Sequence, residues 1–237
     1  YREKLLDAKV MLDANERRTH IRIEAEKLAA SEGLTVLDDP ALLDEVTGLV
    51  EWPLVYLGSI EGGFMDVPSE VLITTMRSHQ KYFSCLDANG NVASRFIMVA
   101  NTETKDSGEK VIRGNERVLR ARLSDAKYFW DQDRKTTLLS KTEALKNRIF
   151  HAQLGTLFEK TARVQVLAME IASYVKDADK DQVGLAAQLA KADLSSEMVS
   201  EFPELQGVMG RYYAIHDGHS RDVADAIAEH YSPLGPN

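Results

Sequence analysis

The sequence predicts an α+β protein of two domains, a mixed α/β domain over residues 1–135 followed by an all-helical domain over residues 136–237. Its length of 237 residues suits two domains of about 100 to 150 residues each. Strand-like runs rich in Val, Ile, Tyr and Phe lie in the first half of the chain. After Asp131, Leu, Ala, Met and Val recur at helical spacing instead, which favours helices alone.

The composition indicates a globular protein that does not enter a membrane. With 44% hydrophobic and 28% charged residues, the chain can bury a core. No apolar run approaches the roughly 18 residues that span a bilayer, and the first residues do not open a signal peptide. We therefore expect a soluble protein in the cytoplasm, and a start at Tyr1 instead of Met indicates a fragment of something longer. The single Cys85 has no disulfide partner and is expected in the core, not as a nucleophile.

The first domain is expected to mix helices and strands. An amphipathic pattern predicts a helix over residues 15–33, and a second begins at Pro40 behind the capping candidates Asp38 and Asp39 and ends at Gly48. A strand is predicted over residues 49–60 and a helix over residues 68–78. Residues 81–87 and 95–100 then predict a hairpin, because Asn89-Gly90 between them tolerates positive φ at both positions.

A helix predicted over residues 114–133 carries the first candidate RNA-binding surface. Between Lys105 and Lys135 there are nine basic and six acidic residues, in a chain of net charge −8 that disfavours non-specific binding to nucleic acid. The apolar stripe comprises Leu119, Leu123, Ala126 and Trp130. A neighbouring stripe can follow phosphates and comprises Arg113, Arg117, Arg120 and Lys127, with Asn115 as an uncharged donor. The alternative is a solvated face with internal pairs such as Glu116–Arg120.

A second candidate surface lies where the predicted helix meets the hairpin. Arg77, His79 and Lys81 stand beside Tyr82 and Phe83, and RNA-binding proteins combine such cations and aromatics to contact phosphates and stack on bases. The alternative is a helix C-terminus whose dipole favours the cations while the two aromatic rings enter the core.

In the second half, residues 142–175, 181–200, 203–215 and 222–231 are each predicted to be helical. Gly207 and Gly210 are expected to permit close helix packing instead of forming a phosphate-binding loop, which would need a preceding strand. The His216-Asp217 pair is expected in a loop and not at a metal.

Three long motifs resemble one protein family. Residues 71–83 read Val-Leu-Ile-Thr-Thr-Met-Arg-Ser-His-Gln-Lys-Tyr-Phe, residues 114–123 read Gly-Asn-Glu-Arg-Val-Leu-Arg-Ala-Arg-Leu, and residues 201–214 read Glu-Phe-Pro-Glu-Leu-Gln-Gly-Val-Met-Gly-Arg-Tyr-Tyr-Ala. In this order they resemble the β subunit of bacterial heterotetrameric glycyl-tRNA synthetase, and the resemblance extends roughly from Glu16 to Tyr231.

The resemblance implies a role in a glycine–tRNA ligase, with the catalytic site elsewhere. It implies that the α subunit handles glycine and ATP with Mg, and that this piece has no catalytic residue, metal or cofactor of its own. Its implied partners are tRNA(Gly), the α subunit and a second β subunit, with no membrane. It also implies that the first domain is similar to the editing-like domain of the phenylalanyl-tRNA synthetase β subunit, and that the second is a degenerate HD-like domain.

The implied HD-like domain lacks the residues that bind metal in working HD sites. Of its His-Asp pair only Asp193 is present, after Ala192, and Lys160 stands where a first His would precede Arg163-Val164. An ammonium group repels a cation that imidazole would bind, so we expect neither metal nor phosphohydrolysis. Asp193 falls on an apolar stripe and is predicted to be buried beside a partner such as Lys160 or an Arg.

Three functions therefore compete. The first is a non-catalytic, tRNA-contacting part of a tRNA ligase, which the family motifs and the arginine stripe favour. The second is an HD-type metal-dependent phosphohydrolase acting on nucleotides, which stoichiometric metal would support. The third is a scaffold that binds the α subunit or another β subunit without touching tRNA.

Overall fold

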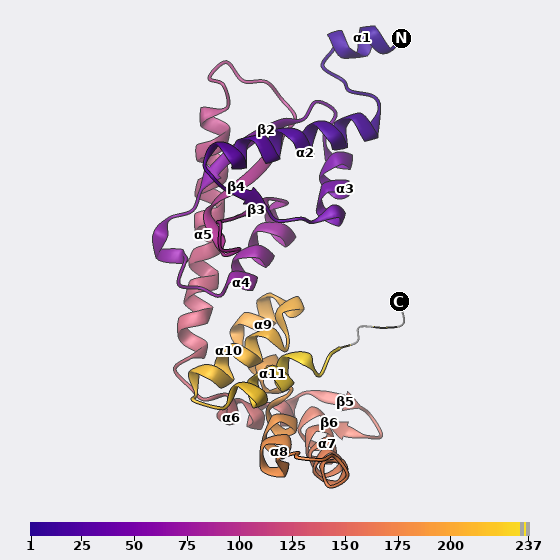
Figure 1. Ribbon diagram of the computed structural model, residues 1–237, viewed down its shortest axis with the longest axis vertical. Helices are drawn as coiled ribbons and strands as arrows, with labels where there is room; N and C mark the ends of the chain where they lie inside the picture. The colour runs from indigo at the N-terminus through magenta and orange to yellow at the C-terminus, as the bar shows by residue number, and fades with distance from the viewer. Residues whose placement is uncertain (233–234, 236–237) are drawn as a thin grey trace. The chain divides into compact units, whose positions relative to one another are not determined.

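The computed structural model describes residues 1–232 and 235, and it divides into two compact units, Tyr1–Lys127 and Tyr128–Asn237 (Figure 1). The division falls within helix α5 (Glu109–Asp133), whereas the sequence places the domain boundary after residue 135. Helices and a small sheet together give the α+β class that the sequence predicts. Within the described part of the chain, no helix has both the length and the apolarity that crossing a bilayer requires.

The first unit is built on a four-stranded antiparallel sheet in the order β1-β3-β4-β2. Its strands are β1 (Thr35–Val36), β2 (Leu54–Ser59), β3 (Phe83–Leu86) and β4 (Val92–Ala100). The β3–β4 hairpin is confirmed, with Gly90 at φ 81° in the turn. The predicted strand 49–60 begins only at Leu54, and before it Asn101 Oδ1 accepts from the amides of Glu51 and Trp52 at 2.7 and 2.9 Å. Two-residue β1 is too short to leave a pattern in the sequence.

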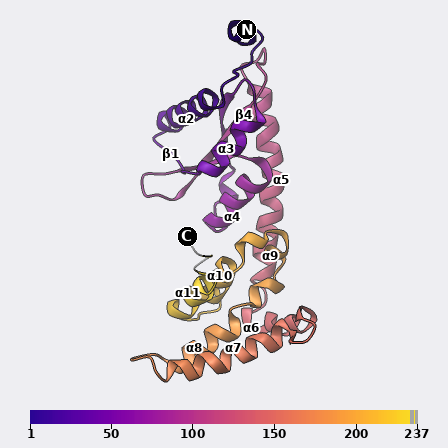
Figure 2. The same cartoon turned by 90° about the vertical axis from the view of Figure 1, so that its right-hand side faces the viewer.

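Helices cover both faces of this sheet (Figure 2). One face packs Phe83, Cys85 and Ile97 against α2 (Ala14–Ser31) and α3 (Pro40–Leu49). Cys85 is fully buried, as predicted, and burial raises the pKa of its thiol to about 11. The other face carries Phe96 and lies toward α5. Only glycine fits at position 58 of this face, because a Cβ there would approach the Phe96 ring to 2.5 Å.

The helices of the first unit begin largely where the sequence places them. Asp13 caps α2, and Asp39 accepts from Leu42 N at 2.9 Å ahead of α3, which begins at Pro40 as predicted. The predicted helix 68–78 divides into α4 (Ser69–Thr74) and a π-helical segment η2 (Thr75–Gln80), which stops at Lys81 with φ 58°. The sequence pattern did not predict two further elements, α1 (Arg2–Asp7) and η1 (Gly62–Phe64).

The second unit is mainly helical, and the prediction that it is entirely helical is wrong. Strands β5 (Ile149–His151) and β6 (Gly155–Thr156) form a hairpin that interrupts the predicted helix 142–175. Gly155 has φ 83°, and Thr156 and Glu159 then form a capping box that starts α7 (Leu157–Ala172). The other helices are α6 (Leu138–Lys141), η3 (Thr142–Asn147), α8 (Lys180–Leu189), η4 (Ala192–Ser195), α9 (Glu197–Glu201), η5 (Pro203–Leu205), α10 (Val208–His216) and α11 (Arg221–Glu229).

Two buried carboxylates organise the second unit. Asp133 accepts hydrogen bonds from the amides of Glu197 and Met198, each at 3.0 Å, and thereby caps α9. It also accepts from Tyr213 Oη at 2.9 Å and pairs with Lys141 Nζ at 3.1 Å. These four contacts compensate the burial of the charge.

The second carboxylate, Asp193, is fully buried. Its Oδ2 accepts from Gly207 N at 2.5 Å and Gly210 N at 3.1 Å. The sequence predicts its burial correctly, but the predicted pairing with Lys160 or an Arg is wrong, because the two glycine amides bind the carboxylate instead. Both glycines also sit in close packing as predicted, since a Cβ at Gly210 would lie 2.6 Å from Ile227 Cγ2.

The His216-Asp217 pair lies at the end of α10, with Gly218 following at φ 84°. His216 is the last residue of the helix and Asp217 caps it, so the predicted loop starts at the C-terminus of α10. Asp217 Oδ2 accepts from Leu138 N at 2.5 Å, which gives this carboxylate a role in starting α6.

Candidate nucleic-acid interface

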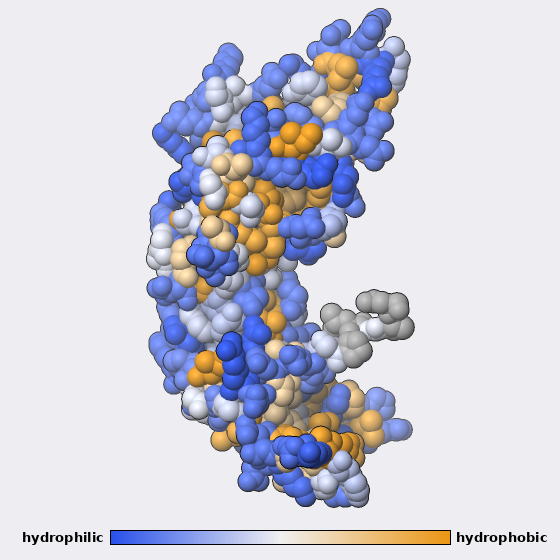
Figure 3. Space-filling model, viewed as in Figure 1, coloured by the Kyte–Doolittle hydropathy of each residue, from blue (hydrophilic) through white to orange (hydrophobic). Residues whose placement is uncertain are grey.

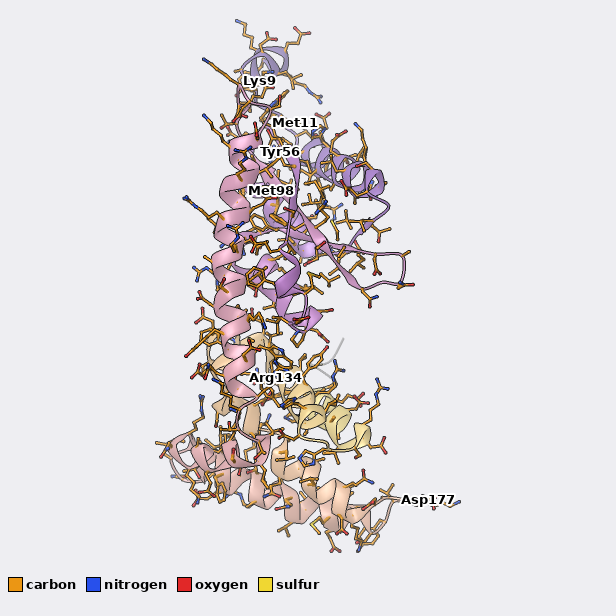
Figure 4. The ribbon with its side chains drawn as sticks, turned by 90° about the vertical axis from the view of Figure 1, so that its left-hand side faces the viewer. Lys9, Met11, Tyr56, Met98, Arg134 and Asp177 are labelled. Carbon is orange, nitrogen blue, oxygen red and sulfur yellow. The ribbon has the colours of Figure 1, made fainter. Side chains whose placement is uncertain are left out.

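Helix α5 presents the arginine stripe that the sequence predicts beside a buried stripe. Leu119, Leu123 and Ala126 are at most 1% exposed and Trp130 is 7% exposed, so the predicted packing face is confirmed. The helix begins at Glu109, five residues before the predicted start, after Gly108 at φ 89°. A side chain at Gly108 would collide with the ring of Tyr56, which Figure 4 shows with Met98 beside α5. The outer side of α5 is mostly hydrophilic (Figure 3).

The cations of the stripe differ in their partners. Arg113 pairs with Glu109, one turn before it, and Arg120 Nε lies 2.6 Å from Glu61 Oε1. Arg117 is exposed, and among residues 1–232 and 235 it has no ion pair or hydrogen bond. Lys127 is half-buried and has an interaction partner. Arg117 is thus the cation of this stripe that stands most open to an incoming phosphate.

Two polar residues of α5 are engaged within the protein. Asn115 donates to Val111 O at 2.7 Å, and its Oδ1 accepts from Tyr82 Oη. Glu116 accepts from the Ser59 backbone amide at 2.8 Å. In place of the Glu116–Arg120 pair of the alternative interpretation, Glu116 contacts Ser59, the last residue of β2, and Arg120 contacts Glu61 just after it. Asn115 fastens the helix to the sheet, a role that the sequence pattern did not indicate.

The second candidate surface lies at the end of η2. Arg77 Nε binds Asp39 Oδ2 at 2.5 Å, and Lys81 Nζ lies 2.8 Å from Glu45 Oε1. Although burial raises the pKa of Asp39, the hydrogen bonds from Arg77 and Leu42 N outweigh it and hold that pKa below its usual value. His79 is exposed and has an interaction partner.

The aromatic residues of that segment are not available to stack on bases. Tyr82 and Phe83 are each 5% exposed, so both rings enter the core, as the alternative interpretation expects for them. Tyr82 stacks on Phe96 with 4.7 Å between ring centroids. Its hydroxyl reaches Asn115, so the two candidate segments meet through an internal hydrogen bond.

In the second unit, two residues that the sequence analysis compares with an HD site, Lys160 and Asp193, have other contacts. Lys160 Nζ lies 3.9 Å from the ring centroid of Phe150, and the nearby Asp193 carboxylate binds glycine amides. No group of three or more His, Cys, Asp or Glu side chains in the described part of the chain is placed to hold a metal ion. The local chemistry is that of a cation cluster beside one buried carboxylate.

Comparisons with known proteins agree along the whole chain. Residues 1–237 match the family model described as "Glycyl-tRNA synthetase beta subunit". The chain is 51% identical over 239 residues to a protein of Rhodospirillum centenum named "Glycine--tRNA ligase beta subunit", covering 100% of the chain and 34% of the relative. Proteins of the same name from Phenylobacterium zucineum and Pseudomonas syringae pv. tomato are 48% and 50% identical, covering 100% and 99% of the chain and 36% and 34% of each relative.

The chain thus spans about a third of the length of the curated relatives it matches. The match covers the sheet unit and the helical unit alike, and includes α5 with its arginine stripe. The chain belongs to the glycyl-tRNA synthetase β subunit family.

Proposed function

We propose that the protein is part of the β subunit of a glycine–tRNA ligase and contributes tRNA binding and subunit architecture, with no catalytic residue of its own. The observation that carries this proposal is the family match over residues 1–237, supported by relatives about 50% identical that carry the ligase name. In this proposal the α subunit binds glycine, ATP and Mg, and a second β subunit completes the cytoplasmic assembly.

The proposed tRNA contact centres on Arg117, with Arg113 and Arg120 on either side. Arg113 and Glu109 are 75% and 62% exposed, and Arg120 and Glu61 are 50% and 57% exposed. Exposed ion pairs of this kind are worth only about 0 to 1 kcal/mol, so phosphate oxygens can replace the carboxylates at little cost. Because the chain has a net charge of −8, binding has to rely on such a local row of cations.

We further propose that the sheet unit corresponds to an editing-like domain and the helical unit to a degenerate HD-like domain. Support for the second assignment comes from Asp193, which lies at a helical joint beside Lys191 and is held by the glycines of the 201–214 motif. The same contacts disfavour the phosphohydrolase alternative. That reaction would also need further metal ligands around Asp193, and in the described part of the chain no group of three or more His, Cys, Asp or Glu side chains is placed to hold a metal.

Salt-dependent tRNA binding tests the proposal. The logarithm of the binding constant falls linearly with the logarithm of salt concentration, and each phosphate contact contributes about 0.9 to the slope. Replacing Arg117 and Arg120 with Ala should reduce that slope by about 1 for each phosphate that the variant no longer binds. The measurement is filter binding of tRNA at several salt concentrations.

Arg122 offers a matched control on the same helix. It is exposed, and at 100° per residue it lies about 140° around the axis from Arg117, on the other side of the buried stripe. Arg122→Ala should leave the slope unchanged. An unchanged slope in the Arg117/Arg120 double variant would refute the tRNA contact, and retained binding to the α subunit by that variant would then favour the scaffold function.

A further inference from the structure

A cavity in the helical unit has one polar end and otherwise apolar walls. It lies between α7, α8 and α11, which pack together in the second unit (Figure 2), and its volume is about 440 Å³. That volume is within the roughly 300 to 1,000 Å³ of small-molecule sites. The walls are mainly alanine, with Ala168, Ala186, Ala190 and Ala226 among them. Lys160, Lys191 and His230 supply the polar end.

The two lysines at this end carry positive charge with little compensation, and His230 lies beside them. Lys191 Nζ lies 3.6 Å from the centroid of the Tyr231 ring, as Lys160 Nζ lies over Phe150. His230 Nδ1 is 2.6 Å from Ile227 O. Within residues 1–232 and 235, neither lysine has a carboxylate within ion-pair distance.

Other cations of the same unit do have carboxylate partners. Lys141 pairs with Asp133, Lys146 with Glu143, Arg134 with Asp131 and Arg221 with Asp225. Among the described residues of this unit Arg148 and Lys180 also lack a carboxylate partner, but both are exposed, whereas Lys160 and Lys191 are half-buried. Asp193 is the acidic group that acts on Lys191, but its Oδ2 is bound by the amides of Gly207 and Gly210.

The cluster costs free energy as long as no anion lies between its members. Burial, and then the charge of Lys160, lower the pKa of Lys191 to about 8. Partial burial, followed by the charges of Lys191 and Lys160, also lowers the pKa of His230. Because Lys160 and Lys191 line the same cavity, their like charges repel each other, and one anionic group bound there can contact both.

We propose that this cavity binds a nucleoside phosphate, with Lys160 and Lys191 contacting the phosphate and the alanine-lined wall contacting the base. Two ammonium groups at one end suit a dianionic phosphate, which offers several strong acceptor oxygens. The methyl groups of alanine leave a shallow, smooth apolar wall against which a flat ring can lie. The ligand is either a free nucleotide or a nucleotide of an RNA chain, and both present this chemistry.

Calorimetric titration of the protein with AMP, and in parallel with adenosine, tests the phosphate contact. AMP should bind, and adenosine should bind at least about tenfold more weakly, which is the reduction expected for one charge-assisted contact. Lys160→Met and Lys191→Met keep most of the aliphatic stem and remove the charge. Each should weaken AMP binding at least about tenfold and leave the affinity for adenosine unchanged.

Lys176→Met is the matched control, because Lys176 belongs to the same unit but is 92% exposed. It should bind AMP as the wild-type protein does. Without ligand, the thermal midpoints of Lys160→Met and Lys191→Met should equal or exceed that of the wild type, because a repulsion is removed. If either variant is less stable, the comparison of AMP with adenosine on the wild-type protein decides the question.

Competition with tRNA identifies the source of the phosphate. Displacement of AMP by tRNA assigns the site to an RNA nucleotide, and AMP binding that tRNA leaves unaffected assigns it to a free nucleotide. Equal affinity for AMP and adenosine, or undiminished AMP binding by the Lys160/Lys191 double variant, would overturn the proposal, as would absence of AMP binding. These substitutions lie in a different unit from Arg117 and Arg120, so the two proposals can fail separately.

Discussion

At the scale of single residues, residue type predicted burial well but predicted contacts poorly. Cys85 and Asp193 are both buried as their settings in the sequence suggest. Asn115, however, is a candidate RNA contact in the sequence analysis, and its side chain instead forms hydrogen bonds with Val111 and Tyr82. A contact between residues 33 positions apart depends on the fold, so local spacing could not indicate it.

The Tyr82–Asn115 hydrogen bond gives a prediction about stability. Tyr82→Phe removes the donor from a partly buried pair, and we expect the free energy of unfolding to fall by about 0.5 to 1.5 kcal/mol. Urea denaturation measures the change. Tyr128→Phe is the control, because Tyr128 is 54% exposed, and it should alter stability little. Equal stability of Tyr82→Phe and the wild type would show that the Tyr82–Asn115 hydrogen bond does not stabilise the fold.

The Asp193 carboxyl gives a prediction about pH. Burial raises its pKa from 3.8 to about 6, although the amides of Gly207 and Gly210 favour the anion. Between about pH 4 and 6 the folded state therefore binds the proton more tightly than the unfolded chain. The resulting stabilisation is present at low pH and is lost as the pH rises through about 6. Asp193→Asn does not titrate, so its stability relative to wild type should increase over this range by on the order of 3 kcal/mol.

Asp87→Asn supplies a control of opposite sign. The backbone hydrogen bond from Asn91, and after it the one from Asn89, lower the pKa of Asp87. The wild-type protein therefore gains stability as the pH rises and this carboxyl group ionises. The Asn variant should thus lose stability relative to wild type over the pH range where Asp87 ionises. Chemical denaturation of each protein from about pH 2 to pH 7 gives both slopes, that of Asp87 below about pH 4 and that of Asp193 between about pH 4 and 6. A flat difference for Asp193→Asn would mean that the buried carboxyl titrates normally.

At the scale of elements, periodicity predicted long helices and missed short strands. The stripe Leu119, Leu123, Ala126 and Trp130 fixed the buried side of α5 from spacing alone. The hairpin of β5 and β6 has only three and two residues, too few for an alternating pattern to show. The Thr156–Glu159 capping box was the local signal that α7 starts there, inside what reads as one continuous helix.

Replacement by Ala should have opposite effects on stability at two helical glycines. Gly210→Ala would place a methyl group 2.6 Å from Ile227 Cγ2 and 3.2 Å from Asp193 Oδ2, so we expect a loss of about 1 to 3 kcal/mol. Gly114→Ala in α5 meets no atom within 4 Å and should stabilise the protein by roughly 0.5 to 1 kcal/mol. Thermal unfolding of the two variants compares them directly. Tolerance of Ala at Gly210 would contradict the close packing of α10 on α11.

At the scale of the whole molecule, the change of period along the sequence indicated two units of different class. Strand patterns end before α5 does, and a sheet unit and a mainly helical unit are what the structure contains. What the sequence could not supply is the set of long-range contacts that hold each unit together. Asp133 is the clearest case, because its partners Met198 and Tyr213 lie 65 and 80 residues further along the chain.

Replacing Asp133 therefore tests whether the two units unfold independently of each other. Asp133→Ala leaves Lys141 Nζ without its partner and the amides of Glu197 and Met198 without an acceptor, and breaking such a buried pair costs about 3 to 5 kcal/mol. Since all four partners belong to the second unit, the destabilisation should be confined there. Hydrogen exchange should show faster exchange of amides in α9 and α10, with β3 and β4 as protected as in the wild type. Equal loss of protection in both units would instead show that they unfold as one, with α5 transmitting the damage across the division at Lys127.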